Sequence, residues 1–299
     1  MDVIVNASSG TDDKANVEQQ LAELFTAVGI EARILLARSG AELLTHARRA
    51  ARDGAQTIVA GGGDGTISAI ASIVAGTDKT LGVLPLGTLN HFAKDLHIPL
   101  DLAGAVRNLA EGRTAKVDVV DVNGEVFINN SSLGIYPQIV REREKKQRQG
   151  MGKWPAFLLA LFTVLRRYPL VSVRLVAHDQ KLLRRTPFVL IGNNEYKTSS
   201  FRMGGRSCLN MGRLSIYTAP VSGRFELFKL FVKAFLGRIS EADNFDSLCA
   251  TEVWVETRRR KIPVALDGEI RRLQTPLHYR VRPGALRVIV PNDQEGEVA

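Results

Sequence analysis

Cysteine is scarce in this chain, and so are several other features that mark particular classes of protein. The two cysteines, Cys208 and Cys249, have neither metal-ligand spacing nor companions, which argues against a disulfide framework and a zinc site. No run reaches the ~18 apolar residues that a membrane span requires. The first residues read as a strand and lack the basic start and small-residue cleavage site of a signal peptide. We therefore expect a cytoplasmic protein.

Aromatic residues are also few, at 6% of the 299 residues, and neither an RNP sequence nor a finger spacing occurs. The formal net charge is +9, from 40 basic and 31 acidic side chains. Such a balance favours an anionic partner, for which a nucleotide and an anionic lipid are the better candidates; we expect no nucleic-acid partner. Because 45% of the residues are hydrophobic, the chain can bury a sizeable core.

The most informative stretch is residues 59–67, where a short apolar strand runs into four glycines, one acid and one hydroxyl before an apolar helix. Glycines let backbone amides approach a ligand closely, and a helix N-terminus adds partial positive charge, so the loop suits a nucleotide phosphate. It is neither a Walker A loop nor a dinucleotide fingerprint. Bare phosphate would repel Asp64, which we expect to contact Mg²⁺ or to polarise a substrate hydroxyl. The alternative is a strand-to-helix turn with a carboxylate N-cap.

Strand-like and helix-like patterns alternate over residues 1–118, which predicts an α/β domain with a parallel sheet covered by helices on both faces. In such sheets ligands bind outside the carboxyl ends of the strands. Three small, polar loops occupy such ends, at residues 6–10, 61–66 and 85–90. We expect the three loops to converge on one edge.

The second half of the chain reads as mostly antiparallel β-structure, and Asn123-Gly124 is a strong hairpin signal. We predict a β-sandwich domain with inserted helices over residues 119–283, and expect residues 284–299 to pack back on the first domain. The strands that we expect after the hairpin are residues 170–177, 186–191, 214–219, 252–256, 262–266 and 277–281.

Two apolar segments interrupt the β-structure, at residues 154–168 and 225–235. Both fit ordinary helices that cover the sandwich. They also fit the border of an apolar pocket or a surface that touches a membrane. The basic run at residues 141–148 is typical of a solvated helix face, and would also suit contact with anionic lipid.

The Gly62-Gly63-Asp64-Gly65-Thr66 loop and residues 85–96 together resemble the diacylglycerol kinase catalytic family, which includes bacterial soluble lipid kinases and the sphingosine and ceramide kinases. The resemblance covers nearly the whole chain and extends to residues 6–10 and to Leu266-Asp267-Gly268-Glu269. It implies an N-terminal α/β nucleotide-binding domain and a C-terminal β-sandwich, with the active site between them. It also implies transfer of the γ-phosphoryl group of ATP, with Mg²⁺, to a lipid hydroxyl; diacylglycerol giving phosphatidic acid is the expected reaction.

The resemblance further implies a role for each matching residue. Asp64 would hold the metal and serve catalysis, while Asp267 and Glu269 would lie near the acceptor hydroxyl, one of them as general base. The residues that would hold the nucleotide are Asn6, Ser9, Gly62, Gly63, Gly65, Thr66, Thr88 and Asn90. These parts suffice chemically, because phosphoryl transfer needs charge neutralisation and alignment more than covalent help from the protein.

Two alternatives stay open. NAD kinase shares the glycine loop, but residues 85–96 and the Asp267-Gly268-Glu269 turn fit it less well. His91 and Met211 depart from the family pattern, Met211 at the position of an acid in a structural metal site, and so allow a regulatory protein that binds nucleotide without catalysis. For a lipid kinase we expect transient contact with an anionic membrane surface. The sequence leaves the acceptor lipid and the oligomeric state undecided, a homodimer included.

Overall fold

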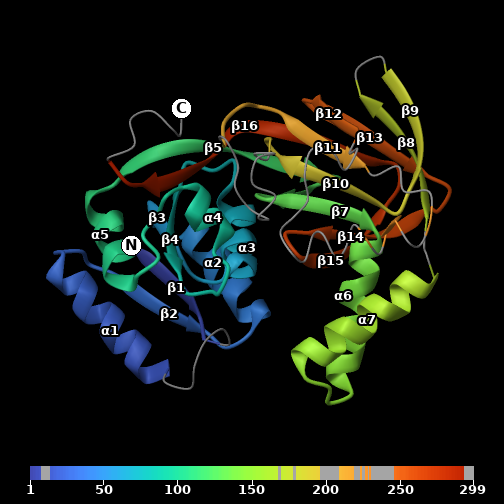
Figure 1. Cartoon of the computed structure of the whole chain (residues 1–299). Coiled ribbons are helices and arrows are strands. Elements are labelled where there is room, and N and C mark those ends of the chain that lie inside the picture. The colour runs from blue at the N-terminus through green and yellow to red at the C-terminus, as the bar shows by residue number, and fades with distance from the viewer. Residues whose placement is uncertain are drawn as a thin grey trace.

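The computed structural model describes residues 1–7, 14–167, 170–177, 180–195, 209–218, 223, 226–227, 229 and 246–292 of the chain. Figure 1 shows a helix-rich unit formed by the N-terminal part of the chain beside a strand-rich unit formed by the remainder. Helices α6 and α7 extend from the strand-rich unit. The chain therefore has the predicted two-domain architecture.

The N-terminal unit is built on four parallel strands in the order β2-β1-β3-β4. They are β1 (Asp2–Asn6), β2 (Arg33–Ala37), β3 (Thr57–Gly62) and β4 (Thr80–Pro85). The helices are α1 (Lys14–Ala27), α2 (Gly40–Arg52), α3 (Asp64–Val74), α4 (His91–Asp95) and α5 (Leu102–Glu111). Continuous apolar runs such as Ile58-Val59-Ala60 suit these strands, because a parallel sheet is buried on both faces.

Helices cover both faces of this sheet, as predicted. Leu43 of α2 and Ile67 of α3 are buried in one apolar cluster, whereas Phe25 of α1 and Val106 of α5 are buried in another. Helices α2 and α5 begin where the sequence supplies a capping residue. For example, Asp101 caps α5 by accepting a hydrogen bond from the Gly104 amide at 2.7 Å, which stabilises the exposed first turn.

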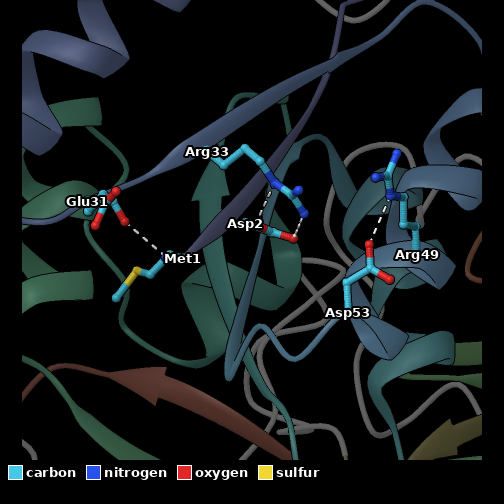
Figure 2. A network of polar contacts seen from close by, with 6 residues as sticks. All are labelled: Met1, Asp2, Glu31, Arg33, Arg49 and Asp53. Carbon is cyan, nitrogen blue, oxygen red and sulfur yellow. Dashed lines mark hydrogen bonds and ion pairs between the residues drawn. The ribbon is translucent and has the colours of Figure 1, made fainter.

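Polar contacts join the elements at the edge of the sheet where β1 and β2 begin, which lies opposite the carboxyl ends of the strands (Figure 2). The buried Asp2 carboxylate accepts from both Nε and a terminal nitrogen of Arg33, its direct neighbour across the strand pair. This contact and the Asp2 charge raise the pKa of Arg33. The Met1 ammonium donates to the Glu31 carbonyl at 2.9 Å, and Arg49 pairs with Asp53 at the end of α2. These contacts stabilise the edge remote from the predicted ligand site.

The strand-rich unit is a sandwich of two sheets. Its strands are β5 (Arg113–Val122), β6 (Glu125–Phe127), β7 (Asn130–Gly134), β8 (Val171–Ala177), β9 (Gln180–Thr186), β10 (Phe188–Asn193), β11 (Leu214–Thr218), β12 (Asp246–Ala250), β13 (Glu252–Thr257), β14 (Lys261–Leu266), β15 (Glu269–Gln274) and β16 (Leu277–Val290). A six-stranded antiparallel sheet has the order β12-β11-β10-β7-β14-β15. It faces the part of the ten-stranded mixed sheet made by β5, β8, β13 and β16 across an apolar core. The predicted sandwich is confirmed.

Strand β16 belongs to both units. Near its start it pairs with β13, and near its end it pairs with β4 of the parallel sheet. The strand that we expected at residues 277–281 continues to Val290. A shift of register against β5 between Arg282 and Leu286 accommodates Pro283 and Gly284. The division between residues 118 and 119 falls inside β5, whose two halves contribute to different cores, and it stays a prediction.

Two helices are inserted between β7 and β8: α6 (Ile135–Arg148) and α7 (Lys153–Arg167). Helix α7 therefore covers residues 154–167 of the apolar segment predicted at residues 154–168, and residue 168 lies outside the described residues. Of the second apolar segment, 225–235, only residues 226, 227 and 229 are described, and Leu227 is buried against α6 and α7. In the described ranges, none of the helices combines the length and apolar character that crossing a bilayer requires.

Candidate active site

The carboxyl ends of β1, β3 and β4 meet at one edge of the parallel sheet, as predicted, although residues 8–10 of the loop after β1 lie outside the described residues. Asn6, the last residue of β1, donates from Nδ2 to the Thr66 hydroxyl at 2.9 Å. The Leu86 amide, just after β4, donates to the Gly62 carbonyl at 3.0 Å. Both contacts join residues that are far apart in the sequence, and together they bring three strand ends into one site.

Glycine is required where two of these loops touch. A Cβ atom on Gly87 would lie 2.5 Å from the Gly63 Cα, and one on Gly62 would lie 2.6 Å from the Thr66 side chain. Both distances are far below van der Waals contact. A side chain at Gly87 would therefore force the two loops apart, and one at Gly62 would displace the Thr66 side chain within the glycine loop. At Gly65, by contrast, a Cβ atom would meet no atom within 4 Å. The backbone beside Gly65 is therefore open to a ligand.

Asn90 shapes the loop that follows β4. It adopts the left-handed conformation, at φ 49°, and is buried. Its Oδ1 accepts from the Gly87 amide at 3.0 Å, while its Nδ2 donates to the Gly87 carbonyl at 2.9 Å and to the Pro85 carbonyl at 3.3 Å. Asn90 thus holds Gly87 against the glycine loop, and Thr88 lies exposed on the same turn.

The start of α3 is arranged to receive an anion. Its N-cap is Gly63, which offers no side-chain acceptor. The Thr66 amide donates to the Gly63 carbonyl at 2.9 Å, which leaves the amides of Asp64 and Gly65 to meet an anion. Asp64 is the first helical residue and does not cap its own helix, contrary to the alternative interpretation of the loop. Its Oδ1 accepts from the Phe92 amide of α4 at 3.3 Å. The site therefore combines open amides with one half-buried carboxylate.

Asp267 lies in the two-residue turn between β14 and β15, with φ 46° for Asp267 and 87° for Gly268. Its carboxylate accepts four hydrogen bonds. The donors are the amides of Ile128 at 2.9 Å, Asn129 at 2.8 Å and Asn130 at 2.9 Å, together with the hydroxyl of Ser68. Each carboxylate oxygen accepts two of these bonds, which uses the full acceptor capacity of the group.

The contact with Ser68 places the Asp267 turn on α3. Ser68 is four residues beyond Asp64 and therefore lies on the same face of the helix. Burial raises the pKa of the Asp267 carboxyl above its usual value, while the hydrogen bonds from Ser68 and the three amides act in the opposite direction. Sequence reasoning did not identify Ser68; its only signal was the spacing of one helical turn from Asp64.

Two other predicted site residues, Glu269 and Ser9, have different outcomes. Glu269, the first residue of β15, is exposed, and its carboxylate pairs with Arg271 at 3.0 Å. Within the described part of the chain, no contact joins Glu269 to the group around Asp267. Ser9 lies outside the described residues.

A buried polar network behind the site was also missed by the sequence prediction. Asp118 of β5 accepts from the amides of Gly212 at 2.7 Å and Gly284 at 2.8 Å, and from Asn194 Nδ2 at 3.3 Å. Asn193 donates from Nδ2 to the carbonyls of Asp118 at 2.8 Å and Ile128 at 2.9 Å. The network thereby supports the backbone at residues 128–130 that binds Asp267.

Met211, next to Gly212, is 43% exposed. Across the residues that the structure describes, three or more His, Cys, Asp and Glu side chains nowhere gather in a way that could hold a metal. Asp64 lies beside the amides at the start of α3.

Comparison with known proteins gives matches over both units. Residues 1–122 match the family model described as the diacylglycerol kinase catalytic domain, and residues 136–290 match the YegS C-terminal NAD kinase beta sandwich-like domain. A diacylglycerol kinase of Staphylococcus aureus is 31% identical over 176 residues, which are 58% of this chain and 55% of that protein. One of Staphylococcus epidermidis is 31% identical over 183 residues, 57% and 58% of the two chains. The chain thus spans little more than half the length of these curated relatives.

A solved structure extends the similarity to the whole fold. The crystal structure of a diacylglycerol kinase from Bacillus anthracis has a TM-score of 0.75, covering 98% of this chain and 97% of that one at 23% identity. At this identity the likeness concerns the fold.

Proposed function

This chain belongs to the diacylglycerol kinase catalytic-domain family, and from that premise we propose that it transfers the γ-phosphoryl group of ATP to the free hydroxyl of diacylglycerol, giving phosphatidic acid. One observation carries the proposal. The glycine loop and Asp64 lie at the start of α3, and Asp267 is hydrogen-bonded one turn further along the same face. The proposed phosphate cradle, metal-binding carboxylate and proton acceptor therefore lie along one face of α3.

The phosphoryl donor is held mainly by backbone. The open amides at the start of α3 bind phosphate oxygens, and the close contact of Gly63 with Gly87 keeps side chains out of the cradle. Asn6, Thr66 and Asn90 act by fixing the shape of the loops. Asp64 would hold Mg²⁺, which would supply neutralisation of charge on the phosphate oxygens.

Asp267 acts on the acceptor. The lipid hydroxyl attacks the γ-phosphorus, the bond from that phosphorus to the bridging oxygen of ADP breaks, and the hydroxyl proton passes to Asp267. Because all acceptor positions of its carboxylate are occupied here, one donor must leave first. The Ser68 hydroxyl is the natural one, since it is chemically equivalent to the lipid hydroxyl that replaces it. Glu269 is exposed, and we propose that it lies on the path by which the lipid acceptor reaches Asp267.

A lipid acceptor requires the protein to reach a bilayer, and we propose that it associates transiently with an anionic membrane surface. NAD kinase is the second candidate, because the C-terminal match is to an NAD kinase-like sandwich. A homodimer, which the sequence left open, stays an expectation.

The test is transfer of ³²P from [γ-³²P]ATP and Mg²⁺ to diacylglycerol, monoacylglycerol, sphingosine, ceramide and NAD. We expect a chloroform-soluble product with diacylglycerol. A labelled product from NAD alone would establish the second candidate, and ATP binding without transfer to any acceptor would favour a regulatory protein.

A further inference from the structure

Helix α7 is apolar on two opposite faces. One face, which includes Ala156, Ala160 and Val164, is buried, and Ala160 and Val164 pack with Ile135 and Ile139 of α6. This contact explains why α6 and α7 form a hairpin. It leaves four large apolar side chains of α7 outside the contact.

The other face is open. Trp154, Leu158 and Phe162, spaced four residues apart, are 67%, 60% and 64% exposed, and Leu159 beside them is 38% exposed. We call these four residues the α7 apolar face. Large apolar side chains are normally exposed singly, so four on one helix indicate a surface that another apolar phase covers.

The charge next to this face is positive. Helix α6 carries Arg141, Arg143, Lys145, Lys146 and Arg148 against Glu142 and Glu144. Three of its basic residues fall in the last turn, and only residues 149–152 separate that turn from α7. The basic end of α6 is thus linked by a short connection to Trp154. Tryptophan beside basic side chains is typical of the boundary between lipid headgroups and acyl chains.

We propose that the α7 apolar face inserts into an anionic lipid surface while the basic end of α6 binds its headgroups. The inference rests on the proposed function, because it identifies how the enzyme meets a substrate that lies in a bilayer. The hairpin is also connected to the site: α6 packs on β14 and β15, the strands that flank the Asp267 turn. Figure 1 shows the hairpin extending away from the sandwich.

The experiment is flotation with phosphatidylglycerol-containing vesicles and with pure phosphatidylcholine vesicles, in the absence of ATP. We expect the intact protein to float with the anionic vesicles. Leu158→Ser with Phe162→Ser should lower the partition coefficient about tenfold or more, since each serine removes a side chain that would enter the apolar phase. Leu183→Ser on β9 is the matched control, because Leu183 is 68% exposed and remote in sequence. Unchanged circular dichroism and Tm would show that the variants fold.

Two further measurements probe charge and insertion. Lys145→Glu with Arg148→Glu should remove the preference for anionic vesicles, whereas Arg259→Glu with Arg260→Glu, also exposed, should retain it. The chain has two tryptophans. In a Trp254→Phe protein, Trp154 emission should shift to the blue when anionic vesicles are added.

The proposal is overturned if the Leu158 and Phe162 substitutions leave flotation unchanged, or if Leu183→Ser reduces it equally. Loss of a dimer in sedimentation with unaltered flotation would assign the face to a second copy of the chain. Phosphorylation of a short-chain, water-dispersed diacylglycerol separates this proposal from the function itself. The Leu158 and Phe162 variant should retain that activity, and its absence in the intact protein would refute the function while flotation still decides the docking.

Discussion

Alanine substitutions at Gly87 and Gly65 of the phosphate cradle should affect protein stability differently, because Gly87 is needed by the fold and Gly65 by the ligand. In Gly87→Ala the new Cβ would lie 2.5 Å from the Gly63 Cα and 2.7 Å from Asn90 Oδ1. Ordinary contact requires about 3.5 Å or more, so the two loops must separate by about 1 Å. Overpacking of this kind costs about 1–3 kcal/mol of unfolding free energy. Thermal unfolding should show a Tm lower by several degrees, with weaker ATP binding.

Gly65→Ala is the informative partner. Its Cβ meets no protein atom within 4 Å, and the residue lies in the first turn of α3 without a positive φ. Alanine is a better helix former, so stability should be unchanged or higher by up to about 1 kcal/mol. If phosphate occupies the open space, the Kd for ATP measured by calorimetry should rise about tenfold or more. Gly65→Ala with normal Tm and normal ATP affinity would refute the assignment of the cradle.

Two further predictions concern the acids. Because the Ser68 hydroxyl lowers the pKa of Asp267 in the free enzyme, Ser68→Ala should raise that pKa and move the acid limb of the kcat/KM profile to higher pH. Ser72→Ala, one turn along α3, should not move it, and an unmoved limb in Ser68→Ala would contradict the role of Ser68. Asp118→Ala removes the acceptor of three donors, the half-buried amides of Gly212 and Gly284 and the buried Nδ2 of Asn194, and should cost about 2 kcal/mol or more in urea unfolding. Asp121→Ala removes one exposed contact and should cost under about 1 kcal/mol; equal losses would argue against the buried network.

The sequence predicted those features that depend on local pattern. Apolar runs identified the parallel strands, and the placing of small polar loops after them predicted the convergence of Asn6, Gly62 and Asn90. The Asn123-Gly124 hairpin was likewise predicted, with φ of 51° and 88° for its two residues. Strand β15 was not predicted, because Ile270 and Leu273 are its only apolar residues among exposed polar ones.

The parts of the site that were missed depend on pairing between distant residues. Ser68 and Asp267 are 199 positions apart, and Asp118 and Asn193 are 75 apart. A serine inside an apolar helix carries no local signal of its partner. The pairing becomes visible only when the two units are placed together, which also explains why Asp267 was predicted as a base and not as a contact between them.

The most direct measurement is incorporation of ³²P into phosphatidic acid from [γ-³²P]ATP, Mg²⁺ and diacylglycerol in mixed micelles, with intact protein, Asp64→Asn and Asp53→Asn. Asp53, an acid at the end of α2 remote from the cradle, is the control for loss of one charge. We predict labelled phosphatidic acid from the intact protein and from Asp53→Asn. For Asp64→Asn we predict a rate that is reduced by about 100-fold or more. Equal rates for all three proteins, or no labelled lipid from the intact protein, would contradict the account.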